Sequence, residues 1–149
     1  MLCLASGGVK AVLAIASFTL AWQHSVEKIR WEESYRVEAG ALVLEEARVQ
    51  GSGAGMEPPL TSSLKDGFWR WQPQQTMSEL LLTRSEFTPD YQFCTRDQCH
   101  ALTEIVPPAA TVTRLWACDK KVTGPPVTAP NVGAQPDIQS ANDQPSAPR

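Results

Sequence analysis

The polar side chains best suited to chemistry gather in one short stretch of the sequence. His24 ends an alternating apolar run and stands beside Ser25, and Glu27, Trp31 and Glu33 follow closely. A catalytic triad needs a nucleophile, a base and an orienting acid in mutual contact. Adjacent residues of a strand point to opposite faces, so His24 and Ser25 are not expected to form such a pair. We interpret His24 as a hydrogen-bonded strand-end residue or a ligand-binding residue.

A glycine-rich bend follows later, in the segment Gly51-Ser52-Gly53-Ala54-Gly55-Met56. A phosphate-binding loop needs a helix behind it, so that amide groups and the helix dipole face the phosphate. Here Glu57-Pro58-Pro59 follows, and no lysine stands in the position that a Walker motif requires. The segment is therefore interpreted as a tight bend or bulge, with a ligand-cradling backbone nest as the alternative.

Topology is expected to bring these two segments together. The runs 31–37 and 42–50 read as a hairpin, and the run that ends at His24 precedes it by a short link. A histidine beside a carboxylate has its charged form favoured and can bind an anion or a partner in a pH-dependent way. No catalytic residue, metal or cofactor is predicted. The candidate binding residues are His24, Ser25, Glu27, Trp31, Glu33, Gly53, Gly55 and Met56.

Four cysteines permit two disulfides and hence an oxidising compartment. Cys94 and Cys99 flank four polar residues that read as a hairpin loop, which favours a disulfide across it. Free thiols remain an alternative, and so does a metal site with His100, although the spacing is not that of a zinc ribbon. Cys3 with Cys118 is a second pair that rests on the even count.

The strands that must position these residues are visible as period-two runs separated by turn signals. Phe18, Leu20 and Trp22 alternate with polar or small residues, which is typical of a half-buried strand. We predict a single all-β domain over 1–118, an antiparallel β-sandwich or open barrel. Further strands are expected at 68–71, 79–83, 91–94, 99–102 and 111–116.

In the longest run, 42–50, the alternation puts Leu42 and Leu44 on one face and Val43, Ala47 and Val49 on the other. Glu45 falls on that second face, which indicates an edge or partly solvated position.

The five tryptophans are dense for this length and indicate core or hairpin-face packing, with a ligand-stacking platform as the alternative. The net charge of −3, with scattered basic residues, argues against a nucleic-acid partner. After Cys118, proline recurs among small polar residues, so 119–149 is predicted to be a disordered tail.

The first twenty residues are mostly apolar and resemble a signal peptide. Lys10 interrupts the apolar run, Gly7-Gly8 break it early, and no basic residue precedes it. We therefore expect two strands, at 2–5 and 9–13, and no integral membrane segment.

The combination of these motifs resembles the small bacterial family known as domain of unknown function eighteen-fifty. The resemblance is carried by Phe18-x-Leu20-x-Trp22-x-His24-Ser25-Val26-Glu27, Trp31-x-Glu33, Leu42-Val43-Leu44-x-x-Ala47-Arg48 and Gly53-Ala54-Gly55-Met56, and extends from about Leu2 to Cys118. Members are typically encoded beside TRAP transporters of the TAXI class, whose binding proteins work in the periplasm. The resemblance implies an accessory role in transport and no established enzyme activity.

We accordingly expect a non-enzymatic binding or interaction module of a TAXI-type TRAP system. Its partner would be a membrane or substrate-binding subunit, at the periplasmic side or at the membrane; without a clear signal peptide, the cytoplasm is the alternative. A stand-alone periplasmic small-ligand-binding domain is the second hypothesis. A hydrolase that uses His24 with Glu33 is the third.

Overall fold

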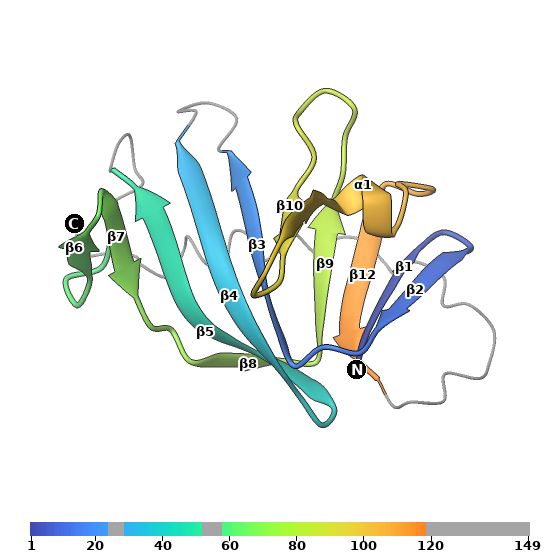
Figure 1. Ribbon diagram of the computed structural model, residues 1–149, viewed down its shortest axis with the longest axis horizontal. Helices are drawn as coiled ribbons and strands as arrows, with labels where there is room; N and C mark the ends of the chain where they lie inside the picture. The colour runs from blue at the N-terminus through green and yellow to red at the C-terminus, as the bar shows by residue number, and fades with distance from the viewer. Residues whose placement is uncertain (24–28, 52–57, 119–149) are drawn as a thin grey trace.

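Two antiparallel β-sheets make up the fold in the computed structural model, which describes residues 1–23, 29–51 and 58–118 (Figure 1). The small sheet has the order β2-β1-β12-β9, and the large sheet has the order β11-β10-β3-β4-β5-β7-β6, with β8 also paired to β5. The edge strands β11 and β6 are not paired with each other, so the described strands form an open sandwich and no closed barrel. The all-β prediction is confirmed.

The elements have the following bounds along the chain. They are β1 (Leu2–Ser6), β2 (Val9–Leu13), β3 (Ser17–Gln23), β4 (Arg30–Glu38), β5 (Ala41–Gln50), β6 (Ser63–Lys65), β7 (Phe68–Trp71), β8 (Gln75–Met77), β9 (Glu79–Thr83), β10 (Gln92–Cys94), β11 (Cys99–Ala101), α1 (Leu102–Ile105) and β12 (Val112–Ala117).

The predicted strands between residues 2 and 13 are confirmed as β1 and β2. All five residues of β1 are buried, and β1 pairs with β2 on one side and with β12, the last strand, on the other. The backbone N–H of Cys118 donates to the carbonyl of Met1 at 2.9 Å. The first and last described strands therefore lie together in the middle of the small sheet.

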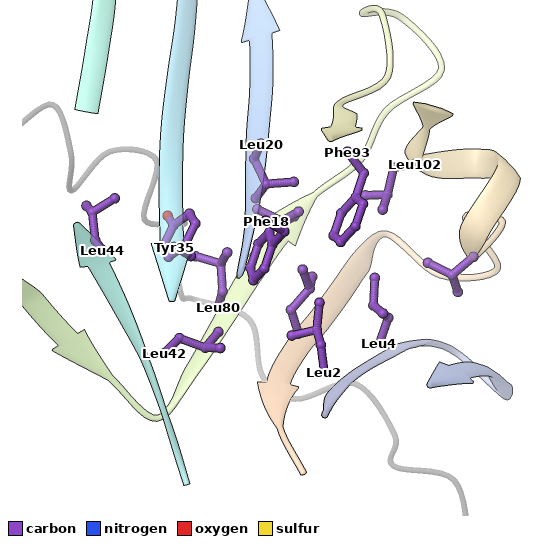
Figure 2. Close-up of a cluster of buried hydrophobic side chains, with 13 residues drawn as sticks. Leu2, Leu4, Phe18, Leu20, Tyr35, Leu42, Leu44, Leu80, Phe93 and Leu102 are labelled. Atoms are coloured by element: carbon purple, nitrogen blue, oxygen red, sulfur yellow. The ribbon is translucent and has the colours of Figure 1, made fainter. Parts of the chain in front are cut away.

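The main core lies between the two sheets (Figure 2). The Phe18 ring stacks on Tyr35 and on Phe93, each with ring centroids 5.1 Å apart. Leucines complete it from both sides, as the alternating pattern of the strands predicts. From the small sheet come Leu2, Leu4, Leu80, Leu82 and Leu115, and from the large sheet Leu20, Leu42 and Leu44.

A β-bulge in β5 overturns the predicted assignment of faces. Tyr35 pairs with Leu44 and Ser34 pairs with Glu46, so that Glu45 has no partner in the register of β4. The extra residue shifts the alternation by one, which places Ala47 and Val49 on the same face as Leu42 and Leu44. Glu45 is partly solvated, as expected, but lies at the bulge of a strand with neighbours on both sides rather than at an edge.

Some short elements were not predicted from the sequence. Strand β6 is exposed throughout, and β8 is a three-residue strand on β5 that has no apolar alternation. Leu102, expected to end a strand, instead begins α1. Such elements carry little hydrophobic pattern, because they bury few side chains.

Both disulfides are present, which confirms the predicted pairs. Cys94 and Cys99 lie opposite each other on β10 and β11, with Cα atoms 3.9 Å apart. Cys3 and Cys118 join β1 to the residue after β12, with Cα atoms 5.9 Å apart. The proposed tail, 119–149, lies outside the described residues, and its disorder stays a prediction.

Candidate functional site

Part of the predicted site falls outside the described residues. These positions are His24, Ser25, Glu27, Gly53, Gly55 and Met56, so their convergence with Glu33 stays a prediction. The residues that flank them are described. Gln23 ends β3, and Gly51 follows β5 with a φ of +75°, a backbone conformation that favours glycine. Because β3 and β5 both pair with β4, these two flanking positions lie at the same end of the large sheet.

Trp31 and Glu33 lie on the inner face of β4, where neighbouring strands supply more tryptophans. Trp31 is opposite Trp22 on β3, and the two rings stack with centroids 6.1 Å apart. The Trp71 ring meets the Trp31 ring edge-on, also at 6.1 Å. We call Trp22, Ile29, Trp31, Ala47, Val49, Trp69 and Trp71 the tryptophan cluster.

The tryptophan cluster differs from the main core in its composition. The main core draws on both sheets, whereas every member of the tryptophan cluster belongs to β3, β4, β5 or β7 of the large sheet, or directly precedes β4. In Figure 1, β7 and β6 lie at the far side of the large sheet from the strands of the small sheet. Trp22 and Trp69 are half-buried, and Leu64 on the adjoining β6 is 57% exposed.

Glu33 lies between this cluster and the main core. Its exposed fraction is 2%, and its Oε1 accepts a hydrogen bond of 2.5 Å from the Tyr35 hydroxyl. Burial raises the pKa of the Glu33 carboxyl to about 8, although the hydrogen bond from Tyr35 acts in the opposite direction. The side chain is therefore a neutral carboxylic acid at neutral pH, and can donate as well as accept a hydrogen bond.

Three buried polar atoms at this place have no hydrogen-bond partner among the described residues. They are Glu33 Oε2, Trp31 Nε1 and Trp71 Nε1. A buried polar atom without a partner costs about 1–3 kcal/mol, and native proteins contain few of them. A ligand or partner whose polar groups reached these atoms would satisfy them, as polar groups do in a mostly apolar binding site.

The opposite face of the same strands carries a charge ladder that sequence analysis did not single out. The Glu32 carboxylate lies 2.6 Å from Arg30 Nε and 2.7 Å from Arg48 Nη2, and Arg48 Nη1 lies 2.5 Å from Glu46. Arg70 completes this ladder at a longer distance, 3.8 Å from Glu46. Its signal in the sequence is alternating charge at period two, in Arg30-x-Glu32 and Glu46-x-Arg48.

We expect Glu33→Gln to change how stability depends on pH. The unfolded carboxyl has a pKa near 4.5, whereas the folded one has a pKa of about 8. Between these values only the unfolded chain releases the proton, so the stability of the wild type falls as pH rises. The variant cannot titrate and should gain at least about 1.4 kcal/mol relative to wild type between pH 5 and pH 8, the equivalent of one pKa unit. Urea unfolding at several pH values measures this difference.

Glu32→Gln is the matched control, because it changes the neighbouring residue on the opposite face. Burial tends to raise the pKa of Glu32, but the hydrogen bonds from Arg30 and Arg48 outweigh burial and lower it. The stability that Glu32 contributes is therefore present above about pH 4.5 and lost as pH falls through the folded pKa. Its substitution should do most harm at neutral pH. A Glu33→Gln curve parallel to wild type would refute the assignment of a neutral carboxylic acid.

Comparison with known proteins gives one result. The family described as Domain of unknown function (DUF1850) matches residues 18–102, more than half of the chain. No curated protein and no solved structure matches. Within the described ranges, no helix is long and apolar enough to cross a membrane. The matched range contains β3, apart from Ser17, and β4 to β11, and hence the whole tryptophan cluster with Glu33. The chain belongs to the DUF1850 domain family.

Proposed function

We propose that this chain is a non-enzymatic interaction module of a TAXI-type TRAP transport system, and that it binds its partner through the tryptophan cluster. The observation that carries the proposal is that this cluster is built from one sheet and that two of its indole N–H groups, with the adjacent Glu33 carboxyl, have buried polar atoms without partners among the described residues. The transport system itself is inferred from the resemblance to the family.

The chemistry of the cluster suits a protein partner. Tryptophan offers a large apolar area together with one polar N–H group, and it is enriched among the residues that dominate binding energy at interfaces. The half-buried Trp69 and the exposed Leu64 lie opposite each other on β7 and β6, at the edge of the large sheet. A segment of a transporter subunit placed against this edge would cover apolar surface and could supply acceptors to the indole N–H groups.

The disulfides support a place outside the reducing cytosol. Two disulfides in a small domain are typical of the periplasm or another oxidising compartment. This is where the substrate-binding subunits of TAXI-type systems work, so the proposed partner and the proposed location agree.

A stand-alone small-ligand-binding domain is the second candidate. The three polar atoms favour it, because none of them has a partner in the described part of the chain and they would suit the polar groups of a ligand as well as those of a protein. The hydrolase hypothesis gains less support. A neutral, buried Glu33 does not carry the negative charge that would stabilise a charged histidine at neutral pH, which is the role this hypothesis gives it.

Trp69→Ala should weaken binding to the substrate-binding subunit of the proposed TAXI-type system by tenfold or more, about 1.4 kcal/mol or above. Isothermal titration with the purified subunit measures the affinity. Trp116→Ala is the matched control, since Trp116 lies on the small sheet, where Arg114 covers its ring at 4.2 Å. The control should bind as wild type does.

Two outcomes would count against the proposal. Equal losses in both variants would show that the tryptophan cluster is not the binding surface. No binding of wild type to either the substrate-binding or the membrane subunits would refute the link to transport, and would leave the small-ligand hypothesis to be examined with the Glu33 variant.

A further inference from the structure

A pocket of about 400 Å³ lies at the C-terminal end of β7, beyond the last residue of β7 that pairs with β6. Its lining residues are Glu46, Thr61, Ser63, Arg70, Trp71 and Gln72. Ser63 begins β6 and pairs with Arg70, so among the described residues no strand pairs with Trp71 on the side of β7 that faces β6. The pocket therefore lies where the charge ladder of the outer face meets the edge of the tryptophan cluster.

The charges of the ladder do not balance at this end. Glu32 is shared by Arg30 and Arg48, and Glu46 is held by Arg48 at 2.5 Å. These four side chains carry two positive and two negative charges. Arg70 adds a further positive charge, and its one charged contact among the described residues is Glu46, 3.8 Å away. The guanidinium at the pocket is thus only weakly compensated.

Two buried N–H donors of the lining residues also lack acceptors. Arg70 Nε and Trp71 Nε1 have no hydrogen-bond partner among the described residues, and Trp71 is 6% exposed. The hydroxyls of Thr61 and Ser63 and the amide of Gln72 add adaptable hydrogen-bonding groups to the lining. The pocket is therefore rich in donors and has one excess positive charge.

We infer that this pocket binds a small organic monocarboxylate. A carboxylate accepts hydrogen bonds from guanidinium and indole N–H groups, and supplies the one negative charge that the ladder lacks. The indole of Trp71 suits an apolar body attached to that carboxylate. A phosphate dianion fits less well, because Glu46 lies at the same pocket and would repel the second charge. This site adjoins the protein interface proposed above and shares Trp71 with it, but it is carried by Arg70 and the charge ladder and is tested separately.

The test is a titration of the ¹⁵N-labelled chain with benzoate, followed by ¹H–¹⁵N correlation spectra. The indole N–H signal of Trp71, identified by its loss in Trp71→Phe, and the Nε–H signal of Arg70 should shift with a saturating dependence on benzoate. Benzamide has nearly the same shape without the charge, and should shift them little. Inorganic phosphate at the same concentration should bind at least tenfold more weakly.

Variants separate the charge from the shape of the pocket. Arg70→Gln should weaken benzoate binding tenfold or more, whereas Glu46→Gln, which removes the repelling carboxylate, should tighten it. Arg36→Gln is the control, because Arg36 lies on the same face of the large sheet and pairs with Glu38 and Glu45, none of which lines the pocket. Intact dispersion of the backbone amide signals confirms that each variant is folded.

Several results would overturn the inference. They are the absence of saturable shifts at millimolar benzoate, equal shifts with benzamide, equal or tighter binding of phosphate, and unchanged binding in Arg70→Gln. Failure of this titration leaves the Trp69→Ala result intact, and failure of the Trp69→Ala experiment leaves the benzoate shifts intact. The two ideas can therefore be refuted separately.

Discussion

Replacing Arg84 with methionine is expected to lower the free energy of unfolding by about 3–5 kcal/mol, the range for breaking a buried ion pair by removing one partner. Arg84 is 7% exposed, and each of its N–H groups has an acceptor. Nε and Nη2 donate to Asp90 at 3.2 and 3.1 Å, Nη1 donates to the Val106 carbonyl at 2.8 Å and to Thr113 at 3.1 Å, and Nη2 also reaches Thr103 at 3.1 Å.

The substitution is severe because Arg84 joins parts of the chain that are distant in sequence. It follows β9 directly. Its partners are Asp90 before β10, Thr103 in α1, Val106 after α1 and Thr113 in β12. Without the guanidinium, the Val106 carbonyl loses a buried donor, and Asp90 keeps only its hydrogen bonds from Thr103, both at 2.7 Å. Burial tends to raise the pKa of Asp90, but hydrogen bonds from Thr103 and Arg84 outweigh burial and lower it.

Urea unfolding at neutral pH measures the loss, and Arg36→Met provides the comparison. Arg36 also has two acidic partners, Glu38 and Glu45, but its side chain is 41% exposed. Exposed ion pairs contribute little, so this control should unfold close to wild type. Similar midpoints for the two variants would show that the buried network around Arg84 adds nothing beyond a surface ion pair.

Removing the Cys3–Cys118 disulfide by a double substitution to serine should cost about 5 kcal/mol. The two cysteines are 115 residues apart in sequence, and in the chain-entropy model a loop of this size contributes about 5 kcal/mol by restricting the unfolded chain. Cys3 is fully buried in the middle of the small sheet, so a serine hydroxyl there adds a further penalty.

The double serine variant of Cys94 and Cys99 is the matched control. This disulfide spans a separation of 5 residues, for which the same model gives about 2 kcal/mol. Urea unfolding of both variants should therefore show a larger fall in midpoint for the Cys3 and Cys118 pair. Equal falls, or a larger fall for the hairpin pair, would contradict an effect that depends on loop length.

Local sequence determined most of the strands. Period-two alternation in 18–22, the break at Gly7-Gly8, and the two cysteines around a polar loop each depend on residues close to one another in the chain. Such signals are readable because a strand with one buried face must alternate, and because a tight turn needs residues that tolerate its backbone angles. The pairing of Cys94 with Cys99 follows from the same local geometry.

Tertiary structure alone decided the faces, the core partners and the site. The bulge at Glu45 depends on how β5 pairs with β4, and it moves Ala47 and Val49 to the face that carries Trp31. Glu33 becomes a neutral acid because several strands exclude water from it. Burial, pairing register and the environment of a charge arise from segments far apart in the sequence, so no local pattern contains them.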